Sequence, residues 1–223
     1  MPWFERWLGY AAPIGHGLLT TAALSAVAIA MGFAVAIALH LTRTRTCTRG
    51  PLPARGLVGV YVSFFRGTPL LVQLLMLFYL PAAFGLDLNP WLAAGLVLAL
   101  NSAAFQSEIL RSGFEAIPVA QLEAARVFGL SERQMFRHIQ LPQVLRLTFP
   151  ALVNEAVDII KGSAVVSVLA IADLMRVGKQ LVAVSYRPLE VYLAIALAYL
   201  VLTTLVSWGA ARLVRARSTG AAA

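Results

Sequence analysis

Four polar residues lie within one otherwise apolar stretch of the sequence, and their spacing places three of them on one face of a helix. Asn154, Asp158 and Lys161 occupy positions i, i+4 and i+7, and Glu155 lies at the edge of that face. Ionisable side chains at membrane depth are costly, so they are candidates for a functional site. Two carboxylates beside an ammonium group have the charges to hold a zwitterionic small molecule. The alternative is an internal Asp158–Lys161 ion pair that only makes the buried charge tolerable.

A second group of candidates lies around a proline in an earlier apolar stretch. Pro69 has no N–H group and Gly67 loosens the helix, so we expect backbone groups near Gly67 and Thr68 to be freed. Unwound membrane helices can present backbone amides to a substrate carboxylate, and Gln73 would add a side-chain hydrogen bond one turn later. The alternative is a simple proline kink. We expect this break to meet the polar face, with the carboxylate of a zwitterion at the amides and its ammonium at the acids.

A polar island interrupts the apolar sequence between Glu123 and Pro142. It predicts two short helices with a turn at Gly129, ended by Pro142, which disfavours helix in the residue before it. Small side chains would allow a partner's backbone to approach, and a short amphipathic helix suits a partner's groove. The alternative is an ordinary solvated loop. The residues in question are Glu123, Ala124, Ala125, Gly129, Ile139, Leu141 and Pro142.

The composition indicates an all-α integral membrane protein. The chain has 223 residues, of which 60% are hydrophobic and 13% charged, and its mean hydropathy is +0.79. A soluble domain of this size needs a more polar surface. The net charge of +8 comes from arginines beside apolar stretches, which indicates orientation in the membrane rather than nucleic-acid binding. His16, His40 and His138 are isolated in the sequence, so no metal site is expected.

The apolar stretches predict five membrane spans, with the N-terminus outside and the C-terminus in the cytoplasm. The basic segment Thr42–Arg55 is expected inside and Pro81–Pro90 outside, whereas segment 173–187 is external or re-entrant and carries basic residues against that rule. An odd number of spans argues against a complete internally duplicated transporter. The predicted parts are an interfacial segment 1–16, spans 17–41, 56–80, 91–109, 149–171 and 189–213, a loop 111–146 and a tail 214–223.

The spacing in the polar island is that of a known signature. Glu-Ala-Ala, three residues, Gly, nine residues, Ile, one residue and Leu-Pro resembles the cytoplasmic loop of ABC importer permeases. The segments Ser63–Gln73, Ser107–Ser131 and Leu141–Leu174 resemble the permeases of polar amino acid importers, the histidine, glutamine, glutamate, arginine and opine group. One departure follows Lys161, where that group usually has Asp/Glu-Thr-Ser and this chain has Gly162-Ser163-Ala164.

The resemblance implies a type I ABC importer permease-like bundle of five transmembrane helices with a cytoplasmic coupling helix in the bacterial inner membrane. It implies two permease subunits, identical or different, two ABC ATPase subunits that bind ATP and Mg, an external solute-binding protein and a polar amino acid as substrate. The coupling helix would dock into a cleft on the ATPase subunit. The sequence has no GxxxxGK[ST] phosphate loop, so we expect no cofactor in this chain and no enzyme activity of its own.

Three other functions compete with this interpretation. An ion-gradient-driven secondary carrier or channel would use the same intramembrane charges without needing the loop Glu123–Pro142. A membrane-embedded enzyme would need catalytic groups converging at one depth, and the sequence shows no such arrangement. Within the favoured family, this chain would alternatively be the half of a heterodimeric permease that does not bind substrate.

Overall fold

Every element in the described part of the chain is a helix, which confirms the all-α prediction. The computed structural model describes the backbone of residues 3–49 and 53–219 and the side chains of residues 9–42 and 56–214. The elements are α1 (Trp3–Arg49), α2 (Pro53–Gly67), α3 (Leu70–Ala82), α4 (Pro90–Glu115), α5 (Val119–Val127), α6 (Glu132–Met135), the π-helix η1 (Phe136–Gln140), α7 (Leu141–Gly162), the 3₁₀-helix η2 (Ser163–Leu169), α8 (Leu174–Ser185) and α9 (Pro188–Thr219).

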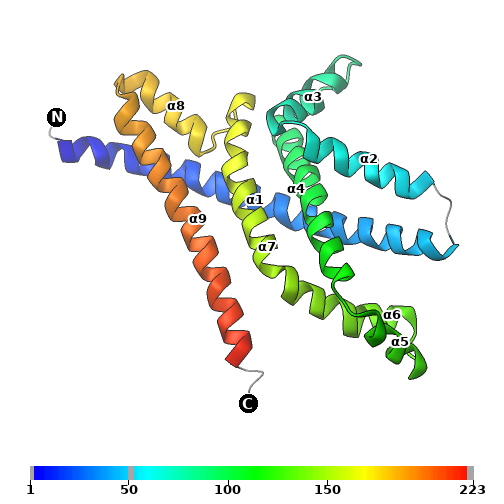
Figure 1. Ribbon diagram of the computed structural model, residues 1–223. Coiled ribbons are helices and arrows are strands. Elements are labelled where there is room, and N and C mark those ends of the chain that lie inside the picture. The colour runs from blue at the N-terminus through cyan, green and yellow to red at the C-terminus, as the bar shows by residue number, and fades with distance from the viewer. Residues whose placement is uncertain (1–2, 50–52, 220–223) are drawn as a thin grey trace.

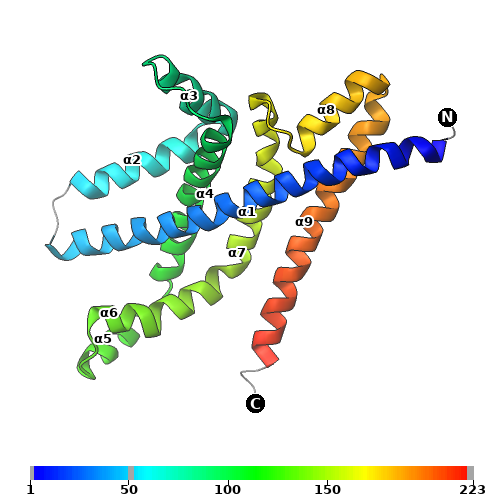
Figure 2. The ribbon, with the colours of Figure 1, turned by 180° about the vertical axis from the view of Figure 1, so that it is seen from behind.

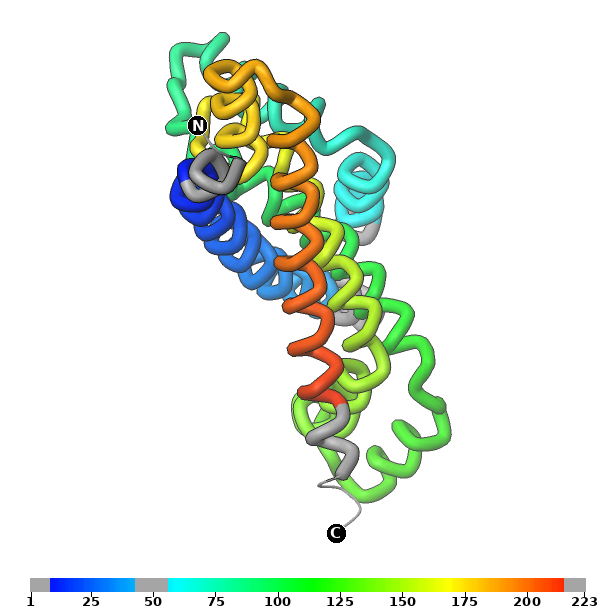
Figure 3. Tube along the Cα trace, turned by 90° about the vertical axis from the view of Figure 1, so that its left-hand side faces the viewer, coloured from blue at the N-terminus to red at the C-terminus, as the bar shows by residue number. Residues whose placement is uncertain are grey.

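The helices form a splayed bundle crossed by α1. Figure 1 shows α4, α7 and α9 running along one direction, with α3 and α8 at one end and α5 and α6 at the other. Seen from behind in Figure 2, α1 crosses in front of these three helices. In the side view of Figure 3, α9 runs toward the end that carries α5 and α6. The loop that contains α5 and α6 therefore projects from one end of the bundle.

Small side chains allow α1 and α4 to pack closely. A Cβ atom added to Gly32 would lie 3.0 Å from the carbonyl oxygen of Ala99 and 3.1 Å from the backbone nitrogen of Ala103. Ala28 and Ala36, one turn to either side, are fully buried. In lipid, where apolar side chains gain little by leaving the solvent, such close packing is a main source of helix association.

Three described helices are long and apolar enough to cross a membrane, namely α1 over Gly9–Thr42, α4 and α9 over Pro188–Val214. The pair α2 and α3 passes the same test as one broken span, with a bend of 114°. The predicted span 56–80 is therefore not one continuous helix. The predicted fourth span is outside this set. It coincides in part with α7, which carries Arg146, Glu155, Asp158 and Lys161.

Several helix ends differ from the prediction. The predicted interfacial segment 1–16 and the predicted span 17–41 form one helix from Trp3 onward. A continuous helix satisfies the backbone hydrogen bonds of both parts, so no break is needed between them. Most of the predicted loop Thr42–Arg55 belongs to α1 and α2, and residues 50–52 lie outside the described residues. The predicted span 149–171 also changes form, since α7 ends at Gly162 and continues as η2.

Candidate functional site

Three backbone hydrogen bonds form the turn after α5. Phe128 N–H donates to the Ala124 carbonyl at 3.1 Å, Leu130 N–H to the Ala125 carbonyl at 3.1 Å, and Gly129 N–H to the Arg126 carbonyl at 2.9 Å. This is the Schellman arrangement, which requires a left-handed residue just beyond the helix. Gly129 has φ +77°, which glycine adopts without the steric cost that a Cβ atom brings. The predicted turn at Gly129 is confirmed.

A capping box begins α6 immediately after this turn. The Gln134 N–H donates to the Ser131 hydroxyl, and the Gln134 side-chain oxygen accepts from the Ser131 N–H at 2.9 Å. Arg126 Nε also forms an ion pair with Glu132 at 3.1 Å across the turn. Local sequence thus ends one helix and starts the next, which gives the projecting loop a defined shape.

The outer surface of the loop is partly apolar. Glu123 and Ala124 are exposed, but Ala125, which was predicted to allow close approach of a partner, is only 5% exposed and packs within this chain. Val127 and Phe128 are 87% and 84% exposed. Neither residue was predicted from the sequence, although two adjacent apolar residues beside the turn glycine of a polar island are a signal for a docking surface.

The predicted end of the helix at Leu141-Pro142 is wrong. The helix that begins at Glu132 continues through η1 into α7. Leu141 N–H donates to the Phe136 carbonyl five residues earlier, so the hydrogen-bond pattern has shifted by one residue before Pro142 is reached. Pro142 is the second residue of α7, directly after this irregular turn, and the helix continues through it despite the missing N–H. Ile139 and Leu141 are partly buried, and Pro142 is exposed.

The break between α2 and α3 is held by side chains. The Gln73 amide donates to the carbonyl oxygens of Phe65 and Thr68 and to the Thr68 hydroxyl, each at 2.9 Å. Asn101 of α4 donates to Gln73 Oε1 at 2.9 Å and to the Phe65 carbonyl at 3.2 Å. Gln73 is buried, with 2% of its surface exposed. Its amide supplies hydrogen bonds to carbonyl oxygens that have no helix partner because of the break at Pro69. Asn101 was not predicted from the sequence, because it lies 28 residues from Gln73 along the chain.

Replacement of Gln73 by Met should destabilise the protein. The change keeps the side-chain size but removes the hydrogen bonds from Gln73 to the part-buried carbonyls of Phe65 and Thr68 and the acceptor at 2.9 Å from the Asn101 amide, at a cost of about 1–3 kcal/mol in the free energy of unfolding. Thermal unfolding of the purified protein in lipid nanodiscs measures this. Gln180→Met, at an exposed position on α8, is the matched control and should change stability little. Equal melting temperatures for the two variants would contradict this account of the break.

The four candidates on α7 do not share one environment. Asn154, Asp158 and Lys161 lie on an exposed face, where Lys161 Nζ and Asp158 Oδ1 form an ion pair at 2.8 Å. Glu155 is 7% exposed and lies beside Ser102 of α4. Its Oε1 has no hydrogen-bond partner, and no ion pair reaches it among the described side chains. A buried carboxyl oxygen without a hydrogen-bond partner requires an explanation, because it has lost its hydrogen bonds to water and gained none in return.

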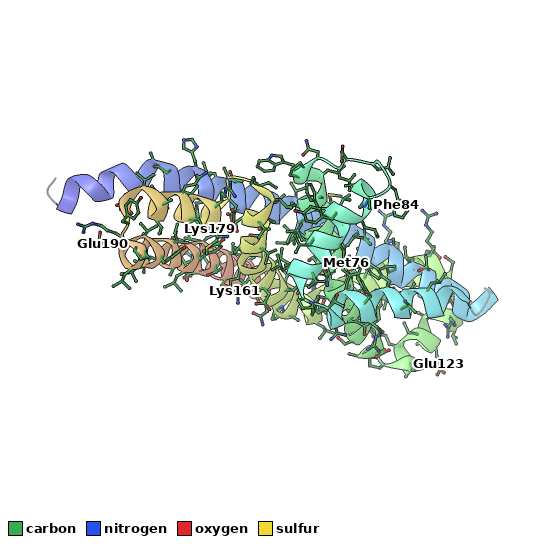
Figure 4. The ribbon with its side chains drawn as sticks, turned by 90° about the horizontal axis from the view of Figure 1, so that it is seen from above. Met76, Phe84, Glu123, Lys161, Lys179 and Glu190 are labelled. Atoms are coloured by element: carbon green, nitrogen blue, oxygen red, sulfur yellow. The ribbon has the colours of Figure 1, made fainter. Side chains whose placement is uncertain are left out.

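The end of α7 lies beside the start of α3. A Cβ atom on Gly162 would be 3.1 Å from the Leu70 side chain. Figure 4 shows Lys161, at the end of α7, near the middle of the molecule and apart from Glu123 in the loop.

At the position where the sequence departs from the family pattern, Ser163 is 1% exposed and its hydroxyl donates to the Ile160 carbonyl at 2.8 Å. Within residues 9–42 and 56–214, no cluster of three His, Cys, Asp or Glu side chains could hold a metal ion.

One helical bundle therefore combines three features: a broken span formed by α2 and α3, a polar face on α7, and a projecting loop that contains α5 and α6. Residues 50–219 match the model of the family described as binding-protein-dependent transport system inner membrane component. The chain belongs to this family. As a member of this family, the chain is a multi-pass inner membrane protein, which agrees with its long apolar helices.

Curated relatives of this inner membrane component are transport permeases. The nopaline transport system permease protein NocM of Agrobacterium fabrum is 38% identical over 66% of this chain and 65% of its own length. The arginine transport system permease protein ArtQ of Bacillus subtilis is 40% identical over 66% of this chain and 68% of its own length. The chain thus spans about two thirds of the length of these relatives.

Solved structures confirm the fold of this inner membrane component. A crystal structure of an amino acid ABC transporter with histidines has a TM-score of 0.86 and 32% identity, and it covers 96% of this chain and 99% of its own. An inward-facing structure of the MetNI methionine ABC transporter has a TM-score of 0.75 at 22% identity over 97% of this chain and 99% of its own, and it supports the fold alone. The permease-like helical architecture expected from the sequence is confirmed.

Proposed function

We propose that the chain is the transmembrane permease subunit of an ATP-driven importer for a polar amino acid. The observation that carries the proposal is the similarity in fold along 96% of the chain to an amino acid ABC transporter, at a TM-score of 0.86. The named cargoes of similar permeases, nopaline and arginine, belong to the same chemical class. The chain would supply the path through the membrane, and a separate ATPase subunit would bind ATP and Mg.

The partners follow from the projecting loop and from the family. The exposed surface around Glu123, Ala124, Val127, Phe128 and Gly129 would dock into a groove on the ATPase subunit. Ile139, Leu141 and Pro142 would set the direction in which that surface leaves the bundle, and Ala125 would hold the turn together from inside. A second permease subunit and an external solute-binding protein would complete the importer.

The substrate path is proposed at the break and at α7. The start of α3 has no side-chain cap, so its first N–H groups near Gly67 and Thr68 are available to a carboxylate. Asn154, Asp158 and Lys161 of α7 would line the open side of the path. Glu155, with its unpaired oxygen, would accept a hydrogen bond from the ammonium group of the substrate when the bundle opens. Gln73 would support the break rather than contact the substrate.

Uptake of labelled amino acids by proteoliposomes that contain the complete importer tests this substrate class. With ATP inside and the solute-binding protein outside, uptake of at least one polar amino acid should saturate, and apolar amino acids in excess should not compete with it. Competition by leucine and valine as strong as that of the polar amino acids would contradict the proposed class.

The native cysteine tests the proposed orientation. Cys47 belongs to the basic segment that we propose to be cytoplasmic, with the N-terminus outside. A membrane-impermeant thiol reagent should therefore label Cys47 only after right-side-out vesicles are opened with detergent. The Cys47→Ser variant, which has no thiol, gives the background. Rapid labelling of the wild type in intact vesicles would reverse the proposed topology.

A further inference from the structure

Three aromatic rings meet where the projecting loop joins the bundle. Phe114 is the penultimate residue of α4, just before the loop, and Phe136 is the first residue of η1, just after α6. Their ring centroids are 5.7 Å apart and their planes differ by 12°. His40, near the end of α1, stacks on Phe114 with centroids 3.7 Å apart and planes 11° apart. We call these three residues the ring stack.

The ring stack joins three elements that the chain does not connect locally. Phe114 and Phe136 bring the two ends of the loop together, and His40, 6.3 Å from Phe136, adds α1 to the same stack. A buried apolar cluster adjoins it, with Ala36 of α1, Leu110 of α4 and Val144 of α7, against which Phe114 itself packs. The base of the loop is therefore tied to α1, α4 and α7 by partly buried rings that adjoin a buried apolar cluster.

The π-helix η1 begins at Phe136, so the ring stack adjoins an irregular turn. π-turns are rare, and they frequently occur at functional sites. Here the π-turn begins at Phe136 and ends where α7 begins. One irregular turn thus lies between the docking surface of the loop and the helix that carries Glu155 and Asp158.

We propose that the ring stack is the positioning contact that passes movement of the docked loop to α1 and the bundle. The inference rests on the proposed function, because it assumes that an ATPase subunit moves the loop. Phe136 would receive the displacement directly from α6, and its stacking on Phe114 and His40 would make α1 move with the loop. Without the rings the loop would still dock, but a given displacement of the loop would move the helices of the bundle less.

The coupling between ATP hydrolysis and transport is measured in proteoliposomes of the complete importer, as the number of amino acid molecules taken up per ATP hydrolysed. Phe136→Leu and His40→Ala remove a ring, and each should lower that ratio about three- to tenfold, the fold-change that corresponds to an aromatic pair energy of about 0.7–1.4 kcal/mol. Phe136→Tyr and His40→Phe keep a ring and should return the ratio to within about twofold of wild type. ATP hydrolysis and co-purification of the ATPase subunit should remain in all four variants.

Tyr79→Ala is the matched control. Tyr79 forms an aromatic pair with Phe78 on α3, with centroids 5.1 Å apart, at the opposite end of the bundle, and its loss should leave the ratio unchanged. Wild-type ratios in both ring-removing variants would overturn the inference alone. Loss of ATPase co-purification in Phe136→Leu would also overturn it, because the ring stack would then hold the docking surface instead of passing its movement. A wild-type importer that takes up no amino acid on ATP would overturn the proposed function, and the inference with it.

Discussion

Replacement of Phe128 by Ala should detach the ATPase subunit from this chain or reduce ATP-driven uptake about thirtyfold or more. Phe128 is 84% exposed at the tip of a turn that hydrogen bonds hold in shape, so its ring is available to fill a partner's pocket. Buried aromatic anchors at interfaces contribute about 2–4 kcal/mol, which corresponds to a loss of about thirtyfold to several hundredfold in affinity. Co-purification of the ATPase subunit with the tagged permease measures the loss directly.

Phe84→Ala provides a matched control for this prediction. It is the same substitution at a phenylalanine that is 78% exposed, but it lies in the turn after α3, and α3 lies at the end of the bundle away from α5 and α6 (Figure 1). The control should bind the ATPase subunit as wild type does. Full co-purification and normal uptake in Phe128→Ala would show that the exposed apolar surface of the loop is not the docking surface.

Neutralisation of Glu155 should weaken substrate affinity far more than neutralisation of Asp158. Glu155→Gln removes a charged acceptor whose Oε1 has no partner within the described chain, and a hydrogen bond to a charged group contributes about 1.5–3 kcal/mol. The apparent affinity should therefore fall about ten- to a hundredfold. Asp158 already pairs with Lys161, and both side chains are more than half exposed, 68% and 57%. Exposed ion pairs contribute about 0–1 kcal/mol, so Asp158→Asn should lower affinity by no more than about fivefold.

Initial uptake rates at several substrate concentrations give the apparent affinities of both variants. Equal losses in Glu155→Gln and Asp158→Asn would show that the exposed face of α7 contacts the substrate as closely as the buried carboxyl does. Wild-type affinity in both would assign these residues to structure, and it would favour a heterodimer in which the partner permease holds the ligand.

Features set by local chemistry could be predicted from the sequence. The turn at Gly129 requires a left-handed residue, and glycine is the residue that adopts this conformation most readily. The break after Gly67 was expected because Pro69 has no N–H group and Gly67 loosens the helix, although Pro13 and Pro150 lie inside unbroken helices. Small residues in α1, such as Gly32, favour close helix packing in lipid, and the structure shows that the packing partner is α4.

Features set by packing could not be predicted in the same way. Helical periodicity placed Glu155 at the edge of the polar face, but only contact with α4 shows that it is buried while Asp158 is exposed. The roles of Gln73 and Asn101 depend on a contact between two helices, which one sequence does not reveal. Leu141-Pro142 was expected to end a helix, whereas the π-turn that precedes it carries the helix through.

The most direct test of the account is amino acid uptake by proteoliposomes in which ATP and ion gradients are controlled separately. We predict uptake with ATP inside and no ion gradient, and no uptake when a membrane potential or proton gradient is applied without ATP. The same vesicles with Phe128→Ala should lose the ATP-dependent signal. Uptake that follows the ion gradient and continues without ATP would contradict the proposed function and would identify the chain as a secondary carrier.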